Sequence, residues 1–371
     1  MRFKSKSNKI VSPLFEGSGM DYGLLIASIA LTVFGLIMVY DSSVVQAYKD
    51  FGDKYYYIKQ QLIWVVLGYF FLTFFAFFNY ENFRKLALPI LAGSFLLLLA
   101  VLIPGLGTAA GGAHRWLKLG PVSIQPAEIM KLASVIFFAA IFEKKPRFAP
   151  FALVVLAASS IIGIFQRDLG STVVFVLISL AMFIGSGANL GYIWLMLPVS
   201  AAGFLFFVLS SAYRKQRVLA FLDPFADPQG FSYHISQVLI ALGSGGLLGL
   251  GLGQSRQKFE YIPEVTTDSI FAIVGEEFGF IGALVLIGLL TFLIYKGFKI
   301  AEAAPDRFGK LLALGLTIWL GSQTVVNLGA MVSLIPLTGV PLPFISYGGS
   351  ALLVNLVAIG ILLNISKNTN R

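Results

Sequence analysis

Residues 269–295 read S-I-F-A-I-V-G-E-E-F-G-F-I-G-A-L-V-L-I-G-L-L-T-F-L-I-Y, a run long enough to cross a membrane as one helix. About 20 apolar residues are needed to span a hydrocarbon core of about 30 Å. The whole chain shares this character, since 57% of its residues are hydrophobic, 12% are charged and its mean hydropathy is +0.84. These values lie far outside those of soluble domains. We therefore expect an integral membrane protein whose spans are helical.

Other apolar stretches flank this run on both sides, which gives ten predicted membrane helices. They are 22–40, 62–79, 86–103, 126–142, 149–165, 170–185, 191–209, 269–295, 310–328 and 347–365. The predicted fold is all-α, with a single transmembrane domain over residues 21–371 and a basic tail over residues 1–20. Residues 210–268 form a long structured loop between the seventh and eighth helices. Within this loop, residues 231–242 have helical periodicity.

Lysine and arginine residues indicate the orientation, because cytoplasmic loops are enriched in them. With ten spans both ends lie on one side, and that side carries more than half of the 27 Lys and Arg residues. We therefore place both termini in the cytoplasm and loop 210–268 on the outer face. The outer face still carries many basic residues. Either its long loops escape the rule, or this face binds something anionic.

Asp268 is the leading candidate for chemistry, because it immediately precedes the apolar run and so lies at the membrane surface. Two interpretations stay open. Asp is a good helix N-cap, and a carboxylate at the mouth of a helical bundle can also act as a general base. Glu264, four residues earlier, could raise the pKa of one of the two carboxyls. It could equally be a solvated loop charge.

A few ionisable residues lie within the predicted spans: Glu128, Lys131, Glu276 and Glu277. Charges at this depth are costly and usually face a bundle interior or a wet cavity. Glu128 and Lys131 are three residues apart and share a helix face. One of the two later glutamates is expected to be protonated or paired, with Lys131 as a candidate partner. A structural role for them is as consistent with the pattern as a catalytic one.

Basic residues also gather in the outer loops. Arginine binds phosphate through its planar fork, and lysine binds it as a point charge. Such a cluster suits a lipid-linked diphosphate, and it also suits the headgroups of ordinary anionic lipids. The predicted substrate-binding residues are Arg115, Lys118, Lys131, Arg214, Arg217, Lys258 and Glu264.

Three further patterns bear on the site. The chain has no Cys, and its two histidines, His114 and His234, are too sparse for a metal site. Gly245, Gly249 and Gly253 recur at four-residue spacing, which permits close backbone packing against a neighbour. Residues 336–350 contain several prolines and glycines. They predict broken or re-entrant backbone at membrane depth, where it would form a cavity wall.

Six stretches, in this order along the chain, together resemble the SEDS family (shape, elongation, division and sporulation), to which FtsW and RodA belong. The resemblance covers nearly the whole chain and rests on the stretches together, since one alone would not be specific. The stretches are 112–133 (G-A-H-R-W-L-K-L-G-P through P-A-E-I-M-K-L-A), 166–170 (Q-R-D-L-G), 213–228 (Y-R-K-Q-R through D-P-F-A-D-P), 237–249, 261–271 (Y-I-P-E-V-T-T-D-S-I-F) and 341–350 (P-L-P-F-I-S-Y-G-G-S).

The resemblance implies a ten-helix glycosyltransferase that polymerises lipid II on the outer face of the bacterial cytoplasmic membrane. The family's essential Asp falls on Asp268. Two neighbours depart from the family pattern, since Thr267 stands where many members have His and Ser269 where many have Phe. No role of that His can therefore be carried over to this chain. G-Q-S-R-Q-K-F at 253–259, together with G-E-E at 275–277, is more similar to FtsW than to RodA. Septal synthesis in cell division is therefore expected. The alternatives are RodA-type elongation and a flippase that carries lipid II across the bilayer.

The resemblance also implies partners. They are lipid II as substrate, a class B penicillin-binding protein as transpeptidase, and other divisome membrane proteins, with no nucleic acid. In the implied reaction a sugar hydroxyl attacks an anomeric carbon and undecaprenyl diphosphate leaves. Asp268 would take the proton and the basic cluster would hold the diphosphate. Magnesium or manganese could assist there, although the sequence offers no dedicated ligand set.

Overall fold

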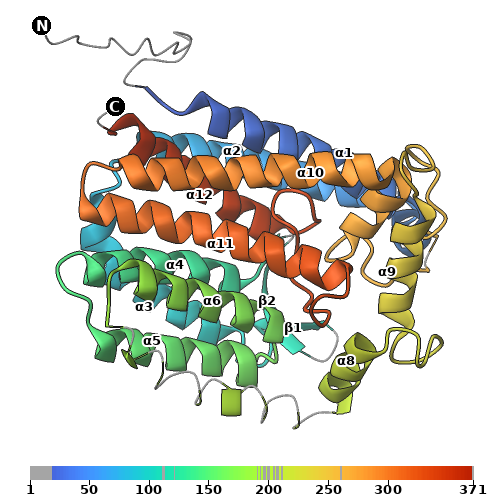
Figure 1. The fold of residues 1–371 in the computed structure, drawn as a ribbon, viewed down its shortest axis with the longest axis horizontal. Helices are drawn as coiled ribbons and strands as arrows, with labels where there is room; N and C mark the ends of the chain where they lie inside the picture. The colour runs from blue at the N-terminus through green and yellow to red at the C-terminus, as the bar shows by residue number, and fades with distance from the viewer. Residues whose placement is uncertain are drawn as a thin grey trace, which may run out of the picture.

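The computed structural model of the chain describes residues 19–110, 113–120, 122–189, 212–259 and 261–369, with scattered residues between 191 and 209. Long helices lie side by side in a bundle (Figure 1). The elements are α1 (Tyr22–Phe51), α2 (Tyr56–Phe77), α3 (Asn82–Ala100), β1 (Gly107–Ala110), β2 (Ala113–Leu119), β3 (Val122–Ile124), α4 (Pro126–Phe142), α5 (Phe148–Ser160), the π-helix η1 (Ile161–Phe165), α6 (Leu169–Gly185), α8 (Ala212–Leu222), α9 (Tyr233–Ser244), α10 (Ile270–Ala303), α11 (Arg307–Met331) and α12 (Gly349–Lys367). We call the end of the bundle that carries α8 and α9 the loop end.

Within the described residues, seven helices are long and apolar enough to cross a membrane. The chain is therefore a multi-pass membrane protein. The predicted span 191–209 lies largely outside the described residues, and each of the other predicted spans coincides with a helix. The total of ten membrane helices thus stays a prediction, as does the orientation of the termini.

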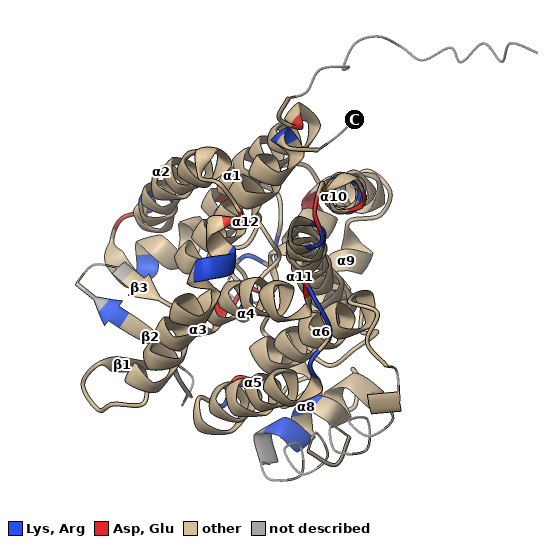
Figure 2. Cartoon of the chain, turned by 90° about the vertical axis from the view of Figure 1, so that its left-hand side faces the viewer, with Lys and Arg blue, Asp and Glu red and all other residues tan. Residues whose placement is uncertain are grey.

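Helix α12 lies in the centre of the bundle. It contacts α1, α2, α4 and α11 (Figure 2). Its sequence, G-S-A-L-L-V-N-L-V-A-I-G-I-L-L-N-I-S-K, is apolar on every face, which is typical of a buried helix. Its polar Asn364 is satisfied by backbone at the end of α2, since its side chain accepts from the Tyr80 N–H and donates to the Ala76 carbonyl. The bundle is therefore built around this helix.

Helix α10 is interrupted at Gly279, where the backbone turns to φ 66° and ψ −166°. The glycine-rich segment 245–251 packs against the break. Leu250 and Gly251 donate to the carbonyls of Glu276 and Glu277, and Phe280 donates to the carbonyl of Gly246. A side chain at Gly245 or Gly249 would overlap α10 backbone. The predicted close packing is confirmed for Gly245 and Gly249 but not for Gly253, where an added side chain would meet only Asp41 at 3.9 Å. The glycine-rich segment bonds backbone groups that the interruption frees.

A three-stranded antiparallel sheet, in the order β1-β2-β3, connects α3 to α4. The all-α prediction was wrong on this point. The residues of β2 alternate in direction as strand residues do, so Arg115 and the buried Leu117 face one side while Trp116 and Lys118 face the other. Such short strands carry a weak pattern, which is why residues 112–121 gave no strand signal from sequence.

Residues 332–348, between α11 and α12, contain no helix or strand and lie within the bundle. A side chain at Gly35 of α1 would overlap the Phe344 carbonyl, and one at Gly170 of α6 would overlap the Thr338 carbonyl. The chain passes close to both helices because glycine leaves room for it. The predicted broken backbone in this region is confirmed.

Candidate functional site

Asp268 lies at the loop end, in the turn before α10, with 6% of its surface exposed. The N-cap of α10 is Ser269, and Asp268 makes no capping bond. In the described part of the chain, the only side chain that donates to its carboxylate is Thr267, whose hydroxyl oxygen lies 3.3 Å away. The capping interpretation was wrong, so this carboxylate is left without a structural partner that explains its burial.

The backbone around Asp268 is held from two other parts of the chain. The Asn327 side chain of α11 donates to the carbonyls of Asp268 and Val340, both at 2.8 Å. The Tyr347 N–H donates to the Thr266 carbonyl, also at 2.8 Å. Gly339, at φ 71°, lies beside the Asp268 carboxylate. Segment 332–348 thus fixes the position of Asp268.

Burial raises the pKa of Asp268 above its ordinary value of 3.8, because the charged form loses its hydration. The nearby positive charge of Arg217 on α8 opposes this shift. Arg217 is itself oriented by the Leu337 carbonyl, to which it donates at 3.0 Å. A carboxyl with a raised pKa beside a guanidinium can take a proton from a substrate and be stabilised once it is charged.

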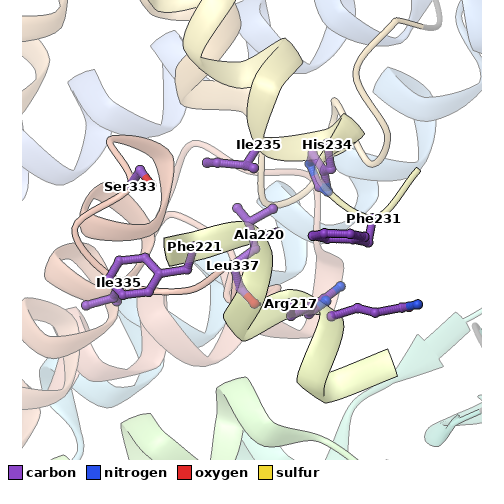
Figure 3. Close-up of a pocket in the computed structure, with 10 residues that line it drawn as sticks. Arg217, Ala220, Phe221, Phe231, His234, Ile235, Ser333, Ile335 and Leu337 are labelled. Atoms are coloured by element: carbon purple, nitrogen blue, oxygen red, sulfur yellow. Dashed lines mark hydrogen bonds between the residues drawn. The ribbon is translucent and has the colours of Figure 1, made fainter. Parts of the chain in front are cut away.

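A cavity of about 120 Å³ opens beside this arrangement (Figure 3). Arg217 and His234 face it, together with apolar side chains of α8, α9 and segment 332–348. Its lining residues are Gln216, Arg217, Ala220, Phe221, Phe231, His234, Ile235, Ser333, Ile335 and Leu337. Asp268 does not line it. The cavity instead reaches the turn before α10 through His234, whose Nε2 lies 2.7 Å from the Ser269 hydroxyl.

His234 is neutral at neutral pH, because burial and the charge of Arg217 lower its pKa to about 4. In the sequence, His234 is only one of two widely separated histidines. His234 is the second residue of α9, and its partner Ser269 lies 35 residues further along the chain. Residue spacing could therefore not predict this contact.

Glu264 is an exposed loop residue in the left-handed backbone region, at φ 51°. It bonds the Thr267 hydroxyl at 3.1 Å, and the same hydroxyl reaches Asp268. The raised pKa of Asp268 comes from burial and not from Glu264. The structure therefore places Glu264 as a solvated charge near the site.

The structure divides the predicted basic cluster. Arg115 donates to the Arg167 carbonyl at 2.7 Å, and its Nε lies 3.9 Å from the Asp168 carboxylate. The charge of Arg214 on α8 is close enough to Arg167 for the two to repel. Lys118 is exposed on the opposite face of β2 from Arg115. Arg167 and Asp168 were not predicted as site residues, although both lie in the Q-R-D-L-G motif.

Lys258 does not lie with the arginines of the predicted basic cluster. Its predicted role in binding the diphosphate was therefore wrong. It is 6% exposed and forms ion pairs with Asp41 at 2.8 Å and Glu277 at 3.1 Å. Burial alone would lower its pKa, but the two carboxylates raise it. Glu276 is bonded in turn by the Ser255 hydroxyl. Lys258 therefore ties the loop before α10 to α1 and to α10. Its charge is neutralised within the fold, which leaves none to bind a ligand.

Lys131 is also not a surface residue, contrary to its predicted role in binding substrate. It is 1% exposed and pairs with Glu128 at 2.7 Å. Its other neighbours are the Gln323 side chain at 3.4 Å and the ring of Trp319. The pairing with Glu276 or Glu277 that the sequence suggested is wrong, because those residues lie with Lys258. Lys131 instead holds α4 against α11.

The fold and this geometry define a multi-pass membrane protein. At one end of its helical bundle lies a buried carboxylate that does not cap a helix. A family model described as cell cycle protein, covering FtsW, RodA and SpoVE, matches residues 22–371. The chain belongs to this family.

Individual relatives support the same family membership. The chain is 40% identical over 354 residues to the probable peptidoglycan glycosyltransferase FtsW of Geobacter metallireducens, covering 93% of this chain and 94% of the relative. It is 40% identical over 355 residues to stage V sporulation protein E of Bacillus subtilis, covering 94% and 97%.

Solved structures share the fold. One, from a study of polymerization and crosslinking by a peptidoglycan synthase complex, has a TM-score of 0.76 at 28% identity, covering 94% of this chain and 98% of that one. The rod shape determining protein RodA of Thermus thermophilus has a TM-score of 0.70 at 26% identity, covering 95% and 98%.

Proposed function

We propose that the protein is a peptidoglycan glycosyltransferase that polymerises lipid II at the membrane surface. The observation that carries this proposal is the buried carboxylate of Asp268, which caps no helix and lies near the guanidinium of Arg217. The chain is also 40% identical to a relative named as a probable peptidoglycan glycosyltransferase. A general base is the group that glycan polymerisation requires at such a place.

In the reaction, the acceptor hydroxyl oxygen forms a bond to the anomeric carbon of the donor sugar. The bond between that carbon and the diphosphate oxygen breaks, and undecaprenyl diphosphate leaves with the electron pair. Asp268 takes the proton of the hydroxyl, help that is typically worth about 10²–10⁴-fold in rate. Arg217 stabilises the negative charges that gather at the site.

The biological setting follows from the same family. We propose septal synthesis in cell division, with RodA-type elongation as the alternative. A class B penicillin-binding protein would supply the crosslinking, as one similar structure comes from a complex that both polymerises and crosslinks. Other divisome membrane proteins would bind the same assembly. Both termini would be cytoplasmic, with the loop end facing outward and ten helices crossing the membrane.

A divalent cation finds no dedicated ligand set here. Across the described residues, no three His, Cys, Asp or Glu side chains gather as a metal site would need. Asp268 is accompanied by a hydroxyl and a guanidinium, and the buried carboxylates of Asp41 and Glu277 already hold Lys258.

Purified protein reconstituted with lipid II, alone and with a class B transpeptidase, tests the proposal. Glycan strands resolved on gels are the expected product, and Asp268→Asn should remove them while leaving the protein folded. Arg256→Gln is a matched control, because this exposed residue lies in the same loop. An Asp268→Asn protein that still makes full-length glycan would remove Asp268 from the mechanism.

A further inference from the structure

One residue of the cavity wall bonds the turn that carries Asp268. His234 projects from α9, and its ring lines the cavity together with Arg217 (Figure 3). The ring nitrogen Nε2 lies 2.7 Å from the hydroxyl of Ser269, the residue next to Asp268. This distance is at the short end of the range for hydrogen bonds. The imidazole therefore joins the cavity wall to the turn before α10.

The Ser269 hydroxyl is not used by the helix that it precedes. Ser269 is the N-cap of α10, and a serine at this position commonly accepts a hydrogen bond from a backbone N–H of the first turn. No such bond forms at Ser269. Among the described residues, the only hydrogen-bond partner of this fully buried hydroxyl is His234. The helix thus lacks a side-chain cap, and the hydroxyl instead ties the turn to α9.

Helix α9 is a firm support for this bond, because its other end packs closely on α10. A side chain at Gly275 of α10 would overlap the side chain of Leu242, and one at Gly245, the C-cap of α9, would overlap the Gly275 carbonyl. Asn327 and segment 332–348 hold the same turn through its backbone. The bond from α9 is therefore a third support for the turn.

The imidazole supports the turn without adding charge to it. Burial and the charge of Arg217 lower the pKa of His234 to about 4, so the ring is neutral at neutral pH. A protonated ring beside the turn would favour the charged form of Asp268 and make it a weaker base. A neutral ring fixes the position of Asp268 and leaves its raised pKa in place.

We propose that His234 is a positioning residue, which acts through Ser269 to hold Asp268 within reach of the acceptor hydroxyl. A general base must lie within hydrogen-bond distance of the proton that it takes, and a displacement of about 1 Å can lower the rate on the order of 10²-fold. Among described side chains only Thr267 donates to the Asp268 carboxylate, so the backbone of the turn has to set its position. His234 itself takes no proton. This inference rests on the proposed function.

Steady-state glycan synthesis from lipid II by the full chain tests the role of His234. His234→Phe keeps a ring and removes the bond, and Ser269→Ala removes its partner. Each should lower kcat about tenfold and leave KM within about twofold, because the position of the base changes and substrate binding does not. The double variant should be no slower than the slower single variant, since both changes remove one bond. His234→Gln and Ser269→Thr keep a hydrogen-bonding group and should retain most of the rate.

Ser236→Ala is the matched control, because this buried serine also lies on α9 and its hydroxyl reaches only backbone carbonyls. It should lower thermal stability and leave kcat unchanged, which separates a loosened α9 from loss of the His234 bond. A wild-type kcat for His234→Phe, a rise in KM alone, or a double variant that shows the product of both single effects would each overturn the inference. The polymerase proposal would then still stand, provided that Asp268→Asn is inactive. Glycan synthesis by Asp268→Asn would instead overturn the proposed mechanism, and this inference with it.

Discussion

Asp168 and Asp268 occupy similar positions in the fold, but only Asp168 caps a helix. Both lie at the loop end in the turn before a helix, and both are largely buried, at 4% and 6% exposure. Asp168 caps α6 and accepts three hydrogen bonds from Ser171 and Gln125. Asp268 lies one residue before the cap of α10 and accepts a long bond from the Thr267 hydroxyl and one from its own backbone N–H. One carboxylate is used by the fold and the other is not.

The difference shows that burial alone does not tell whether a carboxylate has a structural role; its hydrogen bonds do. The cost of burying Asp168 is offset by its hydrogen bonds, so its position needs no functional explanation. Burial of Asp268 is not offset in this way, and its raised pKa records the cost. A buried acid whose few hydrogen bonds do not offset the cost of its burial is the better candidate for chemistry.

The largest expected effect separates the two acids by activity. Asp268→Asn should lower the rate of glycan synthesis by about 10²–10⁴-fold, because the general base is lost. Its thermal stability at neutral pH should equal or exceed that of wild type. The folded-state pKa is raised, so the stability that Asp268 has at low pH is lost as pH rises through that pKa. Thermal melts at several pH values would check this, and a melt well below wild type at neutral pH would contradict it.

Asp168→Ala should show the opposite pattern. It removes the cap of α6 and should lower the free energy of unfolding by about 0.5–2 kcal/mol. Asp168→Asn keeps a capping oxygen and should lose less. Both would be measured by thermal unfolding in detergent. Equal melting of Asp168→Ala and wild type would mean that the two carboxylates do not differ as described.

The pH dependence of activity sharpens the comparison further. Asp268 must be ionised to act as a base, so activity should fall as pH drops through its raised pKa. The charge of Arg217 lowers that pKa. Arg217→Gln should therefore move the acid limb of the rate profile to higher pH, and Arg217→Lys should move it less. A limb that stays in place would show that Arg217 does not act on Asp268.

The smallest effect is expected at Glu264. Its side chain is exposed, and it reaches Asp268 only through the Thr267 hydroxyl. Glu264→Gln should change the polymerisation rate by less than about threefold, the range typical of surface changes. Steady-state assays on the same preparation would measure this. A loss as large as that of Asp268→Asn would make the two acids a functional pair.

The helices were predicted well from the sequence. In a membrane, an apolar run of about 20 residues must bond its own backbone groups, and a helix does so within one segment. The sequence also predicted the broken backbone at 336–350 and the close packing at Gly245, since proline and glycine restrict the chain locally. It missed the sheet at 107–124, whose strands are short, and the interruption of α10 at Gly279, which depends on a loop far away in the chain.

Within the site, the sequence pointed to Asp268 and Arg217 but grouped Lys131 and Lys258 with them. Lys131 lies within a predicted span and Lys258 in the loop before one, and both were grouped with the arginines by charge alone. Their partners, Glu128 for the first and Asp41 with Glu277 for the second, decide otherwise. The pair of Lys131 with Glu128 is visible in their three-residue spacing, whereas Asp41, the partner of Lys258 in α1, lies 217 residues away and cannot be read from spacing.

Segment 332–348 has a consequence for how the turn before α10 forms during synthesis. Asn327 follows Asp268 by 59 residues along the chain and the segment lies beyond it, yet both hold the turn that carries Asp268. This turn is therefore made before its supports exist. It can take its final position only after α11 and the segment that follows α11 have been added.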